Sequence, residues 1–288
     1  MSRRRALALF GALGAGATGL YAAVSGNGGY APTPKVAAGT TRTPDRYGGT
    51  ARQVGEWWVP TGTGLLPTVV MVHGGYWRPD YDLHLQDALA ADLAGRGYLV
   101  WNIDYAPSSD PWPATLTDAA AAYDHTFVGV HADRVDRARV AVVGHSAGGH
   151  LSLWLASRGR LPAGAPGAGT YVRPALAVPQ APVAALAKGS ALGLGGGAVD
   201  ALLGGSPKQV PERYAVADPL ALVPSGVRTV LIHGTGDDIV PISQSQDYLA
   251  ATTDCTLVKV PGDHFTHLDP TSQACDELRK ALETLRSA

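Results

Sequence analysis

The sequence is poor in several residue types that mark specialised folds. Its 288 residues include only two cysteines, which allow at most one disulfide and exclude a disulfide-rich scaffold. Charged residues make up 16% and the formal net charge is −1, so the charge balance does not indicate binding to nucleic acid or to an acidic membrane surface. No internal repeat or long low-complexity tract occurs, which excludes repeat and fibrous architectures.

The sequence also lacks the spacing of a metal site. Its nine histidines form no H-E-x-x-H motif and no Cys–His pattern, so we predict no metal and no cofactor. The two cysteines, Cys255 and Cys275, could form a disulfide in an exported protein or could be two separate buried thiols. Spacing leaves both readings open, because a disulfide requires Cα atoms about 4.4–6.8 Å apart.

The abundant residue types indicate one large globular domain. Hydrophobic residues make up 45% of the chain, which is ample for a buried core. The 36 glycines and 21 prolines indicate many turns between regular elements. A chain of this length is long for one domain in general but normal for a single α/β domain.

The N-terminal segment differs from the rest of the chain. Three arginines, Arg3 to Arg5, precede an uncharged run from Ala6 to Val24 that is rich in Ala, Gly and Leu. The run is marginal for a bilayer-spanning helix of about 20 residues. We therefore predict that residues 1–25 are an export signal, similar to a twin-arginine or a general secretory signal, or alternatively an anchor that holds the protein on the outer face of a membrane. Residues 26–44 are predicted to be a flexible tether, and residues 45–288 the folded domain.

Apolar runs of strand length alternate with helical patterns in the folded domain. The strand-like runs are residues 68–73, 98–103, 139–144, 175–180, 228–234 and 256–260. The helical patterns are residues 83–97, 112–127, 147–157, 243–252 and 273–286. Continuously apolar strands followed by helices are typical of a parallel sheet covered on both faces. Alternation in residues 51–60 adds an antiparallel strand. The predicted fold is therefore α/β, a mostly parallel, doubly wound sheet with an antiparallel N-terminal edge strand.

Two segments fall outside this alternation. Residues 158–174 are predicted to be a loop. Residues 183–219 are long and rich in glycine, and a long insertion in a compact domain is often functional. We expect residues 183–219 to form a lid or a pocket wall. The alternative is a helix pair that packs against the sheet edge and has no further role.

Polar residues follow four of the predicted strands at the point where each strand ends. They are the segment HGGYW from His73 to Trp77, then Ser146, then Asp237 and Asp238, then His264 and His267. In open α/β sheets, ligands bind outside the carboxyl ends of the strands. The chain order Ser, Asp, His is that of the nucleophile-elbow arrangement. These residues therefore predict a hydrolytic site at this edge of the sheet.

Each of these residue types has a role in nucleophilic catalysis. A serine hydroxyl is a weak nucleophile at neutral pH, so a histidine must take its proton as it attacks. We predict Ser146 as nucleophile, His264 as base, and Asp237 as the acid that fixes the tautomer of His264. Gly144 and Gly148 would permit the tight turn around Ser146.

The same reading predicts an oxyanion hole. Its donors would be the backbone N–H of Ala147 and one N–H of the HGG segment, Gly75 with Gly74 beside it. Tyr76 and Trp77 are predicted to line the substrate pocket, although aromatic residues there could simply pack the loop.

Two neighbours compete for the acid and base roles. Asp238 could replace Asp237, and His267 could replace His264, but the position of each within its motif favours Asp237 and His264. Two further polar residues near these positions, His145 and Asp104, are predicted to be structural.

Four motifs together resemble one family. HGGYW, GHSAGGHL, HGTGDDIVP and DHFTH follow one another as in α/β-hydrolases, in particular the branch of hormone-sensitive-lipase-like esterases and kynurenine formamidases. The resemblance spans most of the folded domain and implies the triad of Ser146, Asp237 and His264, with an oxyanion loop at Gly74–Gly75. HGGYW in particular resembles the formamidases. Ala106–Pro107 stand where relatives often carry an arginine after the tyrosine, and in this the pocket departs from the family pattern.

These observations predict a serine hydrolase that acts through an acyl-enzyme. The first hypothesis is a carboxylesterase on small acyl esters. The alternatives are an arylformamidase that hydrolyses an N-formyl amide, and a non-catalytic binding protein with a hydrolase fold, which would be expected to have a broken triad. The expected partner is a small-molecule ester or amide. No nucleic-acid partner is expected, and membrane association is expected only through the N-terminal segment.

Overall fold

The structure, a computed structural model, describes residues 38–286. The predicted export signal at residues 1–25 lies outside the described residues, as do residues 26–37 of the predicted tether. The C-terminal limit predicted for the tether is wrong, because residues 40–44 belong to strand β1 (Thr40–Arg46). This strand pairs along its full length with β2 (Val54–Pro60). Within the described residues it lies at the sheet edge, where Pro44 is tolerated because no further strand described there needs its missing N–H.

The domain is built on one eight-stranded sheet in the order β1-β2-β4-β3-β5-β6-β7-β8. The remaining strands are β3 (Leu66–Val72), β4 (Leu99–Ile103), β5 (Val135–His145), β6 (Leu176–Gln180), β7 (Arg228–Gly234) and β8 (Cys255–Val260). β2 runs antiparallel to both β1 and β4, and the other pairs are parallel. The predicted fold class is thus confirmed, with one correction: the strand within residues 51–60 is second from the edge, and β1 is the edge strand.

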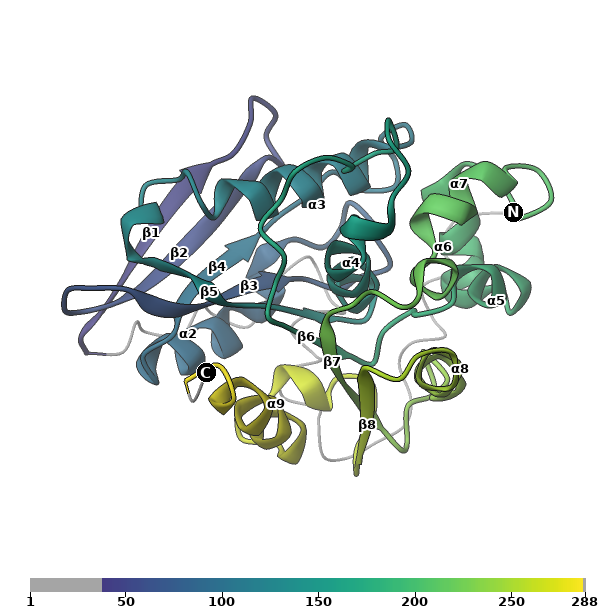
Figure 1. Cartoon of the computed structure of the whole chain (residues 1–288). Helices are drawn as coiled ribbons and strands as arrows, with labels where there is room; N and C mark the ends of the chain where they lie inside the picture. Colours follow the sequence, from purple (N-terminus) through teal and green to yellow (C-terminus); the bar gives the residue numbers. More distant parts are fainter. Residues whose placement is uncertain (1–37, 287–288) are drawn as a thin grey trace, which may run out of the picture.

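Helices cover both faces of the sheet (Figure 1). On one face lie α2 (Asp87–Gly95) and α9 (Gln273–Glu283), and on the other α3 (Ala114–His125) and α4 (Ala147–Ala156). α8 (Ser243–Ala251) packs beside β8. Each face has its own apolar core, and the adjacent residues Trp57 and Trp58 of β2 point into different ones. This two-sided burial explains why the strands are continuously apolar.

Residues 183–219 form three short helices beside α4 (Figure 1). They are α5 (Leu186–Ala191), α6 (Leu194–Leu203) and α7 (Pro211–Ala217). Their apolar side chains join the core on the α3 and α4 face: Leu186, Leu194, Ala198, Val199, Leu202, Leu203, Tyr214 and Ala217. The segment is therefore an integral part of the domain, and its role as a lid or pocket wall stays a prediction.

The two cysteines are separate buried thiols in the structure. Cys255 opens β8, and Cys275 lies in α9 with its Sγ 3.3 Å from the carbonyl oxygen of His267. Of the two readings left open by spacing, the structure therefore has the two free thiols.

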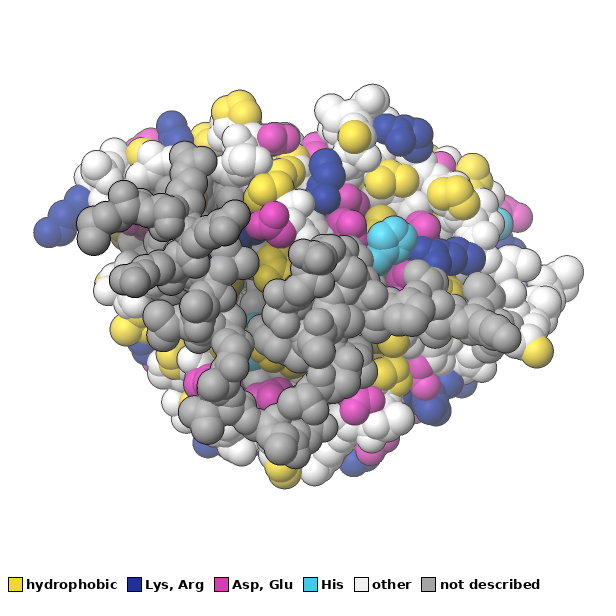
Figure 2. Space-filling view, turned by 180° about the vertical axis from the view of Figure 1, so that it is seen from behind, with side chains coloured by type: hydrophobic (Ala, Val, Ile, Leu, Met, Phe, Trp, Pro, Cys, Tyr) yellow, Lys and Arg dark blue, Asp and Glu magenta, His cyan; other side chains and the backbone are white. Residues whose placement is uncertain are grey.

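The surface carries both signs of charge. On the visible part of the face in Figure 2, acidic and basic side chains lie interspersed. Within residues 38–286, no helix is long and apolar enough to cross a membrane.

Candidate active site

Ser146 lies on a sharp turn between β5 and α4. Its φ of 58° and ψ of −116° are outside the regions that most residues adopt. A Cβ on Gly144 would lie 2.1 Å from the carbonyl oxygen of Gly148, and one on Gly148 would lie 1.9 Å from that of Val72. Only glycine fits at both positions, so the sequence G-x-S-x-G is what allows this turn.

Backbone strain is concentrated at the same edge of the sheet. Within residues 38–286, the non-glycine residues with positive φ are Tyr76, Trp77, Ser146 and Ala181. Ser146 and Ala181 directly follow β5 and β6, and Tyr76 and Trp77 lie in the loop that follows β3. Such conformations cost about 1–3 kcal/mol each and cluster at functional sites. The strain therefore supports this edge as the candidate site.

Asp237 is a buried carboxylate with a full set of donors. Its Oδ1 accepts hydrogen bonds from the backbone N–H groups of Ile239 (3.0 Å) and Val240 (2.8 Å). Its Oδ2 accepts one from His264 Nδ1 at 2.7 Å. Burial by itself would raise the pKa of Asp237, but the hydrogen bonds from His233 and His264 outweigh it and hold this pKa well below its usual range. Asp237 is therefore ionised, and because His264 donates from Nδ1, its Nε2 can accept a proton.

His264 lies beside the turn that carries Ser146. The ring of His145, the residue before Ser146, is 4.6 Å from the ring of His264, and its Nε2 donates to the carbonyl oxygen of His264 at 2.8 Å. Burial lowers the pKa of His145 well below its usual range, so this ring is neutral. In the described part of the chain, Ser146 Oγ makes no direct hydrogen bond with His264. Such contacts often form only in the substrate complex.

The competing acid and base take no part in the hydrogen bond between Asp237 and His264. Asp238 is exposed to solvent. His267 is fully buried, and neither ring nitrogen has a hydrogen-bond partner. The structure thus brings Asp237 and His264 together, and not Asp238 or His267.

The burial of His267 predicts a specific dependence of stability on pH. Burial lowers its pKa from 6.5 to about 3, so between these values the unfolded chain binds a proton that the folded protein does not. The free energy of unfolding is therefore unaffected by the titration of this ring above pH 6.5. Below pH 6.5 it decreases by about 1.4 kcal/mol per pH unit. Between pH 6.5 and 4.5, the free energy of unfolding of His267→Leu is expected to fall by about 2–3 kcal/mol less than that of the parent. Urea unfolding measures both values. Equal losses in both proteins would contradict the assignment of a neutral, buried ring.

The HGG segment lies directly against Ser146. A Cβ on Gly74 would be 3.2 Å from Ser146 Cβ and 2.9 Å from the carbonyl oxygen of His145. Gly75 has a φ of 107°, and a Cβ there would lie 2.3 Å from the ring of Tyr81. Close approach of this backbone to Ser146 therefore depends on Gly74, and the packing of the loop on Tyr81 depends on Gly75.

His73 fixes the orientation of the Gly74–Gly75 peptide. Its Nδ1 donates to the carbonyl oxygen of Gly74 at 2.7 Å, and its Nε2 lies 3.0 Å from Asp104 Oδ1. Arg52 Nη2 pairs with the same carboxylate oxygen at 3.1 Å. In a planar trans peptide the C=O and N–H point in opposite directions, so the Gly75 N–H points away from His73. The ring thus holds this N–H in one of two possible orientations.

This contact predicts the effect of removing the imidazole nitrogens. His73→Phe would keep a ring that can stack on Tyr105, as His73 does at 4.3 Å, but would release the Gly74 carbonyl oxygen. The sequence predicts the Gly75 N–H to be an oxyanion donor, and loss of one such donor typically lowers kcat about 10²–10³-fold, so we expect this loss in kcat with little change in KM. Steady-state kinetics on an ester checks it. A kcat within about threefold of the parent would show that His73 does not orient the peptide.

Tyr76 and Trp77 have different surroundings. Tyr76 donates from its hydroxyl to the carbonyl oxygen of Ile239 at 3.1 Å and packs its ring on Gly195. It therefore joins the HGG loop to the loop of Asp237. Trp77 is 1% exposed and packs edge-to-face on His150 at 5.2 Å. The structure shows a packing role for Trp77, and substrate binding by either aromatic residue stays a prediction.

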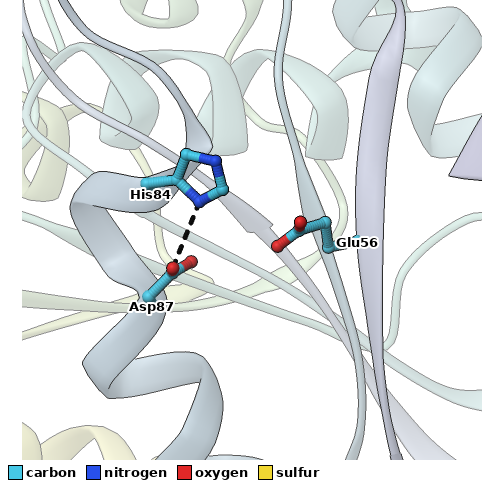
Figure 3. Close-up of side chains that lie close together, drawn as sticks. All are labelled: Glu56, His84 and Asp87. Atoms are coloured by element: carbon cyan, nitrogen blue, oxygen red, sulfur yellow. Dashed lines mark hydrogen bonds and ion pairs between the residues drawn. The ribbon is translucent and has the colours of Figure 1, made fainter. Parts of the chain in front are cut away.

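A second polar cluster, away from these residues, resembles a metal site. Ligand atoms of Glu56, His84 and Asp87 lie within 4.8 Å of one another (Figure 3). However, Arg42 Nη2 pairs with Glu56 and lies 3.2 Å from Asp87 Oδ2 and 3.1 Å from His84 Nδ1. The guanidinium is thus the cation of this cluster, and a metal ion there would be repelled by it. The cluster ties β1 and β2 to the helical segment of His84 and Asp87.

Sequence reasoning assigned no role to His73 or His233. Each is the histidine of a quoted motif and stands at the carboxyl end of a strand, the same signal that pointed to the other site residues. Their contacts run through carbonyl oxygens and through partners distant in sequence, such as Asp104 for His73. Sequence spacing does not encode such contacts.

Comparisons of the sequence connect the chain to ester hydrolases. A family model described as BD-FAE matches residues 58–163. Carboxylesterase NlhH of Mycobacterium tuberculosis is 36% identical over 114 residues, 38% of this chain and 35% of that protein. Carboxylic ester hydrolase LipN of the same species is 40% identical over 105 residues, 32% of this chain and 25% of that protein. The chain thus spans about a third or less of the length of the curated relatives it matches.

Comparisons of the structure extend over most of the chain. A truncated carbohydrate esterase from gut microbiota superposes with a TM-score of 0.71 at 18% identity, covering 86% of this chain and 97% of that one. Esterase B from Lactobacillus rhamnosis superposes with a TM-score of 0.72 at 21% identity, covering 88% and 87%. At these identities the likeness establishes the fold.

Proposed function

We propose that this chain, which has the α/β-hydrolase fold, is a serine esterase that hydrolyses small carboxylic esters through an acyl-enzyme on Ser146. The observation that carries the proposal is the hydrogen bond from His264 Nδ1 to the buried carboxylate of Asp237, beside the turn of Ser146. The curated relatives named as carboxylesterases support the choice of ester over other acyl substrates.

In the proposed mechanism, each residue handles one proton or charge. His264 Nε2 takes the hydroxyl proton of Ser146 as Oγ attacks the ester carbonyl. The backbone N–H groups of Ala147 and Gly75 stabilise the oxyanion that forms. His264 then gives its proton to the departing alcohol, which leaves an acyl group on Ser146. A water molecule attacks this acyl group by the same steps in reverse, releasing the carboxylic acid and restoring the serine.

Asp237 stabilises and orients His264 during these proton transfers. Its negative charge stabilises the imidazolium of His264 while the proton is held there. Because Oδ1 is anchored by two backbone N–H groups, the carboxylate presents Oδ2 to His264 in a fixed position.

The same residues could act on an N-formyl amide, since both reactions pass through a tetrahedral oxyanion. The HGGYW segment is the feature of this chain that favours that alternative. The two substrates differ in the leaving group, which is an alcohol in one case and an aromatic amine in the other.

The experiment that tests the proposal compares kcat/KM for p-nitrophenyl acetate and butyrate with that for N-formylkynurenine. We expect at least a tenfold preference for an ester, which corresponds to about 1.4 kcal/mol of transition-state binding. A preference for the formamide would replace the esterase by the formamidase. A folded protein that turns over neither substrate would contradict both and support the binding protein.

A further inference from the structure

Asp237 Oδ2 has a second histidine partner besides His264. His233 is the penultimate residue of β7 and is fully buried. Its Nε2 lies 3.3 Å from Asp237 Oδ2 and 2.9 Å from the carbonyl oxygen of Val240. A carboxylate and a carbonyl can only accept hydrogen bonds. His233 Nε2 therefore carries a hydrogen and donates it to the loop that holds the acid.

The other nitrogen of this ring is matched by a hydroxyl. His233 Nδ1 lies 2.7 Å from Ser245 Oγ, on the buried side of α8. A hydroxyl can donate to an unprotonated Nδ1, so Ser245 is compatible with the tautomer that has its hydrogen on Nε2. The chain thus contains a continuous series of contacts from Ser245 through His233 and Asp237 to His264.

We propose that His233, oriented by Ser245, is a positioning residue of the active site that shares Asp237 Oδ2 with His264. The inference rests on the proposed function, because it assigns His233 a part in the same reaction. His233 Nε2 donates to the carbonyl oxygen of Val240 at 2.9 Å and also lies 3.3 Å from Oδ2, so its N–H reduces the negative charge that this oxygen offers to His264. His233 also holds Val240, so it fixes the two ends of the short loop that carries the acid.

The rings that lie around this pair, those of His145, His267 and Tyr76, are neutral. Burial lowers the pKa of His145 well below its usual range and that of His267 to about 3. Burial raises the pKa of Tyr76, which faces Asp237 from the HGG loop, to about 12. A change in the proton affinity of His264 on replacing His233 therefore reports on Asp237 Oδ2.

Two substitutions at the same position separate the donor from the packing. His233→Gln can place an amide N–H close to where Nε2 stands, whereas His233→Leu fills the space without a donor. In His233→Leu, Oδ2 interacts with His264 alone and stabilises its imidazolium more strongly. We expect the acid limb of kcat/KM to move upward by roughly 0.5–1 pH unit in His233→Leu and to stay near the parent in His233→Gln. Limbs that coincide in all three proteins would overturn the proposal, since a purely structural role would lower activity without moving the limb.

NMR gives the same test without a substrate. In protein labelled with ¹⁵N-histidine, the titration midpoint of the His264 ring, assigned with His264→Gln, is expected to rise in His233→Leu by the same amount. A rise in this midpoint together with no ester turnover would support the role of His233 and contradict the esterase. Ester turnover with an unchanged titration midpoint would support the esterase and contradict the role of His233.

The parent protein alone provides a check that does not depend on the folding of any variant. The ¹⁵N spectrum is expected to show a hydrogen on His233 Nε2 throughout the pH range of activity. A ring with its hydrogen on Nδ1 only could not donate to Asp237 and would overturn the proposal.

Discussion

Ser146→Ala is expected to lower kcat for an ester by about 10⁴-fold or more. The substitution removes the only atom to which the acyl group is transferred in the proposed mechanism. Ser146 is buried on a turn already set by Gly144 and Gly148, and alanine fits the same backbone. The free energy of unfolding is therefore expected to change by no more than about 1 kcal/mol. Burst and steady-state kinetics, with urea unfolding alongside, measure both quantities.

The matched control is Ser157→Ala, at the other end of α4. Ser157 is also buried, but its hydroxyl bonds the carbonyl oxygen of Leu153 within the helix. We expect its activity to stay near that of the parent. Substantial hydrolysis by Ser146→Ala would rule out Ser146 as the nucleophile.

Asp237→Asn is expected to have an effect of similar size. The N–H groups of Ile239 and Val240 require an oxygen at the Oδ1 position, so the amide nitrogen would occupy the Oδ2 position. There it would face His264 Nδ1, which could then only accept. The hydrogen of the ring would move to Nε2, where it blocks proton transfer from Ser146. A loss of about 10⁴-fold in kcat follows from this wrong tautomer.

Asp238→Asn is the matched control for the acid. Asp238 is the adjacent residue and is exposed, so the same chemical change there leaves the contacts of His264 intact. Steady-state kinetics on both variants separates the two carboxylates. If Asp238→Asn loses activity and Asp237→Asn retains it, the acid is Asp238.

The parallel part of the fold could be predicted from the sequence because its signals are local. Each central strand is buried on both faces and therefore reads as a continuous apolar run, as in residues 140–144. The tight turn at Ser146 likewise needs glycine at both neighbouring positions, and this requirement is visible in the motif.

The parts that were missed depend on contacts distant in the sequence. Strand β1 is polar and half exposed, so only its pairing with β2 identifies it as a strand and not as the end of a tether. In residues 183–219, Gly193 and Gly195 to Gly197 have left-handed φ values that interrupt α6, so no continuous helical pattern is visible in the sequence. The position of the helices in this segment is set by packing on the core.

The candidate site shows the same division. Ser146, Asp237 and His264 were predicted because each belongs to a motif at a strand end. His73 and His233, which contact the surroundings of these residues, have partners of their own in other elements: Asp104 for His73 and Ser245 for His233. Neither Asp104 nor Ser245 belongs to a motif. Only the folded chain brings them into contact.

The central claim is that Ser146 is the nucleophile that carries the acyl group. The most direct measurement is to treat the folded protein with a fluorophosphonate, which forms a covalent bond with an activated serine, and to map the adduct by peptide mass spectrometry. We expect a single adduct on Ser146, formed much more slowly in His264→Gln and in Asp237→Asn. A folded protein that forms no adduct, or one that is labelled at another residue, would contradict it.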